Sequence, residues 1–322
     1  MSKNDRKRQE LFNLLSANLE LYDPDNAGKF RCPICLDVFG ADSIIGPQPK
    51  VDLAHVYSES CGGKIETLAC ADCNSHVGTW FENDLVKEHR LWSNIQSPDH
   101  GIVAKLEFPE GFAVNARFYS TGPAKTNIEV LAEKNNPKNV ELFKAAISKP
   151  NLSTLNFTLN VPTYHQRKLD VALLHAAYMM MFRMFGYEYI WAAPIEPIRE
   201  LLTGRAAPPH TDFLMMTDLP KANNLSKQLL YRVGIMTDPP EYKSFCVGLP
   251  SPNPQVSTRA IFLPGFGETD CKAYEKLWED RAKKFTVRAT VLKDDLWRHL
   301  GDPNYRYMAQ RLWRFPGHDS AE

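Results

Sequence analysis

Four of the seven cysteines form two matched pairs that could bind a metal ion. The pairs are Cys32-x-x-Cys35 and Cys70-x-x-Cys73, with 34 residues between them. A C-x-x-C turn presents two thiolates at the separation that one tetrahedral zinc ion needs, and two such turns fill a closed structural site. Four unrelated buried cysteines and a redox pair are the alternatives, but no thioredoxin-like βαβ pattern surrounds either pair. We therefore expect a structural Zn²⁺ that stabilises a segment too small to bury its own core.

A histidine and an asparagine accompany these cysteines in an expected strand–loop–strand–helix unit. The strands are expected at 51–56 and 65–69, and the helix from Ala71. His55 ends the first strand and Asn74 lies in the first turn of the helix, so the unit brings the two together. The Asn74 oxygen can point at a cation, and a neutral imidazole at His55 can take a proton from water. One metal and one base is an arrangement that hydrolyses phosphodiesters.

Four short segments around these residues match a known arrangement of motifs. They are Leu53-Ala54-His55-Val56, Gly62-Gly63-Lys64, Thr67-Leu68-Ala69-Cys70 and Cys73-Asn74-Ser75-His76-Val77-Gly78. Residues 30–85 thereby resemble the HNH endonuclease family, in the branch with a four-cysteine zinc site and a C-N-x-x-x-G helix start. The resemblance implies a ββα-metal module that cuts DNA, His55 as the general base and Asn74 as a ligand of a catalytic Mg²⁺ or Mn²⁺.

Two positions depart from the family pattern. The family places Asp or Glu directly before the base histidine, as a second metal ligand, and this chain has Ala54 there. Asp52 is the best substitute, because residues i and i+2 of a strand face the same way, and Glu59 is a weaker one. The family's middle asparagine, which orients the base, has no clear match, and Thr67 or Glu66 occupies about its place.

The rest of the chain predicts a larger α+β domain of unknown role in substrate recognition or regulation. Alternating runs over 102–132 read as a β-meander, and an apolar helix is expected at about 166–185, ending at Gly186 in a left-handed cap. We therefore expect an α+β protein with domains at 1–92 and 93–322.

A basic segment near the C-terminus is the second candidate for nucleic-acid contact. Residues 272–315 carry 11 basic and 6 acidic side chains interleaved with tryptophan and tyrosine. Basic residues bind phosphates and aromatic rings stack on bases. Lys283 and Lys284 are the predicted nucleic-acid contacts, and solvated charges over buried aromatic anchors are the alternative.

Composition limits the remaining function classes. The net charge is zero, so no global positive field indicates a polyanionic partner. The longest apolar stretch, Val171–Phe182, is far shorter than the roughly 20 residues of a membrane span. The N-terminus carries no apolar signal core, and unpaired cysteines suit a reducing compartment, so we expect a cytoplasmic protein.

The sequence thus predicts an HNH-type DNA endonuclease, in bacterial antiphage defence or a mobile element. A homo-oligomer or a partner protein of a defence system is compatible with this prediction. The alternatives are a catalytically inactive, zinc-stabilised nucleic-acid-binding module and a protein-interaction domain built on a zinc knuckle. A structural knuckle needs neither His55 nor Asn74, which favours the nuclease, whereas Ala54 favours the inactive module.

Overall fold

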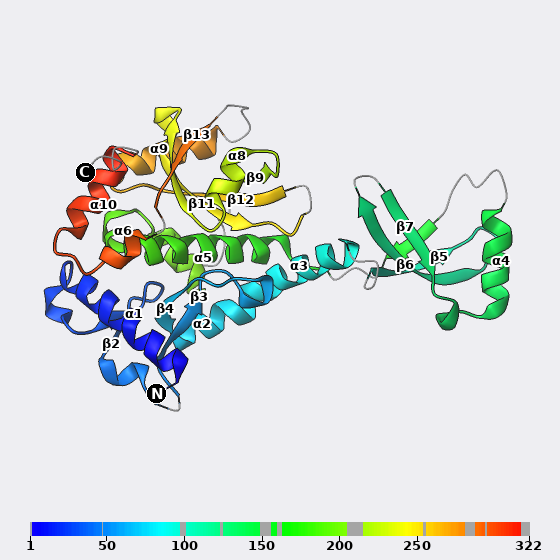
Figure 1. Cartoon of the computed structure of the whole chain (residues 1–322), viewed down its shortest axis with the longest axis horizontal. Coiled ribbons are helices and arrows are strands. Elements are labelled where there is room, and N and C mark those ends of the chain that lie inside the picture. Colours follow the sequence, from blue (N-terminus) through cyan, green and yellow to red (C-terminus); the bar gives the residue numbers. More distant parts are fainter. Residues whose placement is uncertain are drawn as a thin grey trace. The chain divides into compact units, whose positions relative to one another are not determined.

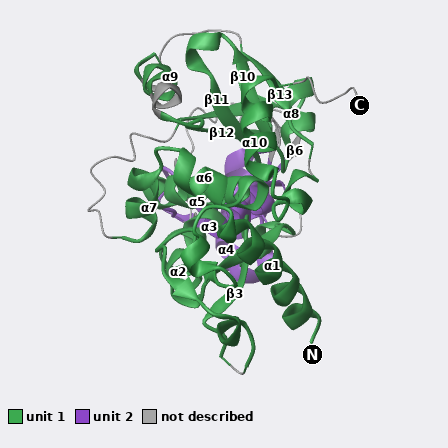
Figure 2. Ribbon diagram, turned by 90° about the vertical axis from the view of Figure 1, so that its left-hand side faces the viewer, with its two compact units in different colours: residues 1–85, 165–251, 255–322 green, residues 86–164, 252–254 purple. Residues whose placement is uncertain are grey.

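The computed structural model divides the chain into two compact units (Figures 1 and 2). It describes residues 2–46, 48–96, 101–122, 125–148, 156–159, 163–204, 215–253, 256–280, 287–293 and 295–316. Unit 1 comprises residues 1–85, 165–251 and 255–322, and unit 2 comprises residues 86–164 and 252–254. The expected domains at 1–92 and 93–322 are each one continuous segment, whereas each of these units is built from segments that are separate in the sequence.

Unit 1 combines helices with three antiparallel sheets. Its helices include α1 (Lys3–Glu20), α2 (Ala71–Val77), the π-helical turn η4 (Gly78–Glu82), α5 (Gln166–Phe185), α6 (Tyr187–Ala192), α7 (Glu196–Leu202), α8 (Asn224–Leu229), α9 (Glu268–Glu279), the short η8 (Leu296–His299) and α10 (Tyr305–Arg314). Its strands are β1 (Phe30–Arg31), β2 (Val38–Phe39), β3 (Val51–His55), β4 (Glu66–Cys70), β9 (Met215–Pro220), β10 (Val233–Asp238), β11 (Ser244–Pro250), β12 (Val256–Leu263) and β13 (Arg288–Val291).

The largest sheet of unit 1 has the order β13-β10-β11-β12-β9 and is antiparallel throughout. Helices cover both of its faces, which explains why nearly all of β11 is buried. Phe245 of β11 packs on Phe185 of α5, with ring centroids 5.1 Å apart. The next residue, Cys246, packs in a cluster with Leu229 of α8 and Leu277 of α9. Successive side chains of a strand point to opposite faces, so α5 lies on one face and α8 and α9 on the other.

Helix α5 is the central element of unit 1. It packs against the five-stranded sheet on one side and against β4 and η4 on the other (Figure 1). A helix that is apolar on most faces is expected in such a position, and the expected range of 166–185 is confirmed. Gly186 has the positive φ of 56° that favours glycine, but its ψ of −138° is outside the left-handed helical region that was expected.

The N-terminal strands form a small ββα unit. β3 and β4 pair as an antiparallel ribbon, in which Val51 lies opposite Cys70 and His55 lies opposite Glu66. α2 follows β4 without a loop, at the residue where a helix is expected. The amphipathic helix α1 packs its apolar face on this ribbon, with Leu11, Leu15 and Leu19 buried.

The loop between β3 and β4 explains the paired glycines. Gly62 has a φ of 87°, a left-handed conformation that glycine adopts without strain. A Cβ atom on Gly63 would lie 1.8 Å from the carbonyl oxygen of Tyr57. The loop therefore folds back on itself only because both positions lack a side chain.

Unit 2 is a four-stranded antiparallel sheet of order β7-β6-β5-β8 with one helix packed on it. Its elements are β5 (Ile102–Glu107), β6 (Ala113–Gly122), β7 (Lys125–Val130), α4 (Pro137–Ile147) and β8 (Asn156–Leu159), and α3 (Asn83–Gln96) runs across the boundary from unit 1. Its core includes Leu106, Val114 and Ala146. The expected meander is confirmed, and the whole chain is α+β as predicted.

Candidate metal centre and histidine site

The first cysteine pair lies in the turn of the β1–β2 hairpin. The Cys32 amide donates to the carbonyl of Asp37 at 2.9 Å, and the Leu36 amide donates to the carbonyl of Cys32 at 3.0 Å. Leu36 has a φ of 66°, which is uncommon for a residue with a side chain. The backbone of this turn is therefore tight, and it places the thiols of Cys32 and Cys35 on one side.

The second pair lies where β4 becomes α2. Cys70 caps this helix, and its sulfur accepts the amide hydrogen of Cys73 at 3.4 Å. The Cys70 amide in turn donates to the sulfur of Cys32 at 3.5 Å, which links the two pairs. A helix N-terminus stabilises thiolates because its amide groups carry partial positive charge.

The four sulfur atoms lie within 4.8 Å of one another, and those of Cys35 and Cys70 are 3.7 Å apart. Zinc–sulfur bonds of about 2.3 Å in a tetrahedron place the sulfurs about 3.8 Å apart, so the cluster fits a metal ion such as Zn²⁺. Hydrogen bonding with Cys32 lowers the pKa of Cys35 to about 6. The predicted four-cysteine cluster is confirmed.

Two buried tyrosines hold the hairpin against the central helices. The Tyr178 hydroxyl on α5 donates to the carbonyl of Pro33 at 2.5 Å. The Tyr187 hydroxyl on α6 donates to the carbonyl of Arg31 at 2.6 Å and accepts the Arg31 amide hydrogen at 2.8 Å. The sequence analysis did not identify these residues, although a tyrosine in a buried helix generally needs a partner for its hydroxyl.

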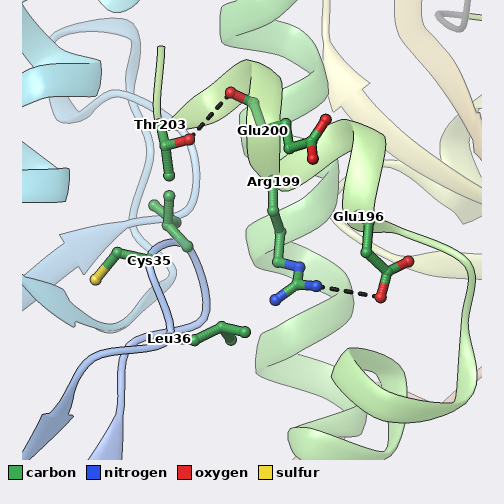
Figure 3. A pocket seen from close by; sticks show the side chains of 7 residues that line it. Cys35, Leu36, Glu196, Arg199, Glu200 and Thr203 are labelled. Carbon is green, nitrogen blue, oxygen red and sulfur yellow. Dashed lines mark hydrogen bonds and ion pairs between the residues drawn. The ribbon is translucent and has the colours of Figure 1, made fainter. Parts of the chain in front are cut away.

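A shallow pocket of about 340 Å³ lies between the hairpin turn and α7 (Figure 3). Arg199 and Glu196 form an ion pair there at 3.2 Å. The Cys35 sulfur points away from the carboxylates of Glu196 and Glu200 (Figure 3). These carboxylates therefore do not join the cysteine ligand set, and the centre keeps four thiols.

His55 lies at the other end of the β3–β4 ribbon. Its Nε2 is 3.5 Å from Oε1 of Glu66, the residue opposite it on β4, and 3.9 Å from Oε2 of Glu59. Lys7 of α1 forms an ion pair with the same Glu66. Thr67, by contrast, is fully buried. Of the two residues considered for the missing asparagine, Glu66 is the one that lies beside the imidazole.

Asp52 lies elsewhere on β3. Its carboxylate accepts a hydrogen bond from Arg8 of α1 at 3.2 Å and from the Leu53 amide at 2.8 Å. Strand alternation places Asp52 and His55, three residues apart, on opposite faces. Ala54 is 1% exposed, so the family's carboxylate position is here part of the core.

Asn74 lies in α2 directly after Cys73, in the first turn as predicted, and is half-buried. His76, two residues on, packs its ring against Trp80 and Phe81, with centroids 6.1 and 5.8 Å away. Within the described ranges, the four cysteines are the one group of at least three His, Cys, Asp or Glu side chains placed to hold a metal ion.

The basic C-terminal segment is only partly described. Lys283 and Lys284 lie outside the described residues. Tyr305 and Trp313 of α10 are buried, which matches the alternative of aromatic anchors, whereas Tyr307 is 68% exposed. Arg306 approaches the buried Glu188 at 3.8 Å.

Comparison with protein-family models, with curated proteins and with solved structures found no match to this chain. Within the described part of the chain, the helices are all too short or too polar to cross a membrane.

Proposed function

We propose that this chain is a metal-dependent HNH-type endonuclease that hydrolyses phosphodiester bonds in DNA, with His55 as the general base. The observation that supports this proposal best is the pairing of His55 with Glu66 at the end of a ββα ribbon whose other end is the cysteine cluster. We extend the proposal to a cytoplasmic protein of antiphage defence or of a mobile element.

The histidine chemistry follows from the carboxylate beside it. If Glu66 accepts the Nε2 hydrogen of neutral His55, it fixes the tautomer whose lone pair is on Nδ1. Nδ1 then takes the proton from the attacking water. Lys7 of α1 forms an ion pair with Glu66 and holds that carboxylate in place.

A bound Mg²⁺ or Mn²⁺ would stabilise the leaving oxygen. Asn74 and Asp52 are the ligands inferred from the resemblance, but the fit is incomplete. Asp52 is engaged by Arg8, and Asn74 offers one neutral oxygen. The ion requirement is therefore the part of the proposal that an assay should test first.

A plasmid-nicking assay with Mg²⁺ or Mn²⁺ tests the proposal. His55→Ala should lower the rate at saturating metal by about 10²–10⁴-fold, the contribution of a general base. His299→Ala, which removes an exposed imidazole from η8, is the matched control and should cut as wild type does. Normal nicking by His55→Ala would exclude it as the base.

A second candidate is a zinc-stabilised module that binds nucleic acid without cutting it. Two observations favour it: Ala54 is buried where the family has a carboxylate, and Asp52 already has a cationic partner. The same preparation separates the candidates, because a module of this kind retards DNA in a binding assay but leaves plasmid intact under every metal tested.

A further inference from the structure

A second, larger pocket of about 470 Å³ lies beside Glu66, on the far side from the cysteine cluster. α1, the loop before β4, α5, the segment 230–232 and η8 all contribute to it, and all belong to unit 1. Its lining includes four cations and one carboxylate: Lys7, Lys64, Arg183, Arg232 and Glu66. Positive side chains outnumber negative ones in this lining, which favours an anionic ligand.

Arg183 gives the clearest indication of such a ligand. It is the last cation on α5, in the apolar second half of this helix, and its guanidinium carbon lies 3.4 Å from the ring centroid of Trp297. Within the described residues this ring is its one close partner, and no carboxylate pairs with it. Burial lowers the pKa of Arg183 to about 10. Arg183 is partly buried, so its guanidinium has reduced access to water and no paired anion, and a bound anion would stabilise it.

Lys7 adds to the same unbalanced charge. Burial and the nearby charge of Arg183 both lower its pKa. Its counter-ion, Glu66, also faces His55, so one carboxylate serves two basic groups. Lys64 and Arg232, both exposed, extend the positive surface to the mouth of the pocket.

The size and lining of the pocket favour a phosphate ester over a simple inorganic anion. A volume of this order suits a small organic ligand. A guanidinium fork can donate two parallel hydrogen bonds to phosphate oxygens, and Lys adds point charges around them. Tyr231 in the wall offers aromatic surface for a base, whereas the ring of Trp297 is already stacked on Arg183.

We propose that this pocket binds a phosphate group of a nucleotide, with Arg183 as its central donor. The nucleotide is either one unit of a nucleic-acid strand or a free mononucleotide. The pocket does not depend on cleavage by His55, and it would serve the non-cutting module equally well.

Binding measurements on the zinc-loaded full-length chain, without added Mg²⁺ so that no strand is cut, test this proposal. The probes are a short fluorescein-labelled single-stranded DNA, followed by anisotropy at several salt concentrations, and dAMP, followed by calorimetry. Arg183→Gln should weaken binding at least about tenfold, the effect of losing hydrogen bonds to a charged group. Lys64→Gln and Arg232→Gln should each reduce the salt slope by about one.

Arg298→Gln is the matched control, because Arg298 also faces Trp297, at 5.7 Å, but does not line the pocket. It should bind as wild type does. If Arg183→Gln weakens the binding of DNA but not of dAMP, the ligand is one unit of a nucleic-acid strand. If it weakens the binding of dAMP, the ligand is a free nucleotide. If Arg183→Gln fails to fold, the two exposed variants carry the test. Unchanged binding in Lys64→Gln and Arg232→Gln, or no binding of either probe by wild type, would overturn the proposal.

Discussion

The two ends of the β3–β4 ribbon differ in how they are built. They are four residue steps apart, about 13 Å at the usual rise per residue. At the cysteine end, four side chains of one kind from residues 32–73 gather within 4.8 Å. At the histidine end, His55 lies 3.5 Å from Glu66 and 3.9 Å from Glu59. Lys7 of α1 pairs with Glu66, and Arg183 of α5 lines the same pocket. The first end is closed and suited to stability, and the second is open, charged and suited to binding.

Replacing one of the four clustered cysteines should produce the largest loss of stability. Cys73→Ser leaves three thiols and a weak fourth ligand, so the chain should lose its zinc and on the order of 4–5 kcal/mol of stability. Elemental analysis and thermal unfolding measure both. Cys61→Ser, a half-buried cysteine of the same ββα segment outside the cluster, is the control and should keep its zinc. A wild-type protein without bound metal would contradict this contrast between the ends.

The cysteine end also depends on α5, and Tyr178→Phe measures how much. The variant removes the hydroxyl that donates to the Pro33 carbonyl and leaves that oxygen without this partner. We expect a loss of about 1–3 kcal/mol in denaturant unfolding, with zinc retained. Tyr307→Phe, at a 68% exposed position of α10, should be neutral. Equal stability of the two variants would mean that the Tyr178 hydroxyl does not help to hold the hairpin.

The buried His175 lies inside α5, the helix that serves both ends, and should make stability depend on pH. Burial lowers its pKa to about 4, from an ordinary value near 6.5. Between those values the unfolded chain binds a proton that the folded chain does not, so stability falls as pH falls. The expected loss between about pH 7.5 and pH 5.5 is about 1.4 kcal/mol.

The free energy of unfolding of wild type and of His175→Leu is measured across this pH range. The contribution of His175 is the difference between the two slopes of free energy against pH. His299→Leu, which changes an exposed histidine, controls for the loss of an imidazole. Identical slopes in wild type and His175→Leu would show that the buried ring does not contribute.

The smallest change in stability should come from a substitution at the histidine end. Lys7→Gln removes the ion pair with Glu66, but the Lys7 side chain is 44% exposed, so the stability change should be under about 1 kcal/mol. Nucleotide binding should weaken in the same variant, because Lys7 lines the basic pocket. A large loss of stability would remove the functional distinction between the two ends.

Local signals in the sequence were enough to predict the cysteine end of this ribbon and most of the helices and strands around it. The C-x-x-C spacing predicts the sulfur cluster because each pair is fixed within one turn. The apolar pattern predicts α5, and the alternation over 102–132 predicts β5, β6 and β7. The apolar pattern of residues 228–236 also predicts a strand, which is partly wrong, because α8 ends at Leu229 and β10 begins only at Val233.

Tertiary structure decided the other end. The sequence places His55 and Glu66 on neighbouring strands, but only packing brings Lys7 to the carboxylate and Arg8 to Asp52. Arg183 reaches the same region from α5, much later in the chain. Contacts between such distant residues depend on how whole helices pack on the ribbon, and no spacing within one segment encodes that. The metal cluster could therefore be predicted from motifs, whereas the charged surroundings of the histidine became visible only in the folded chain.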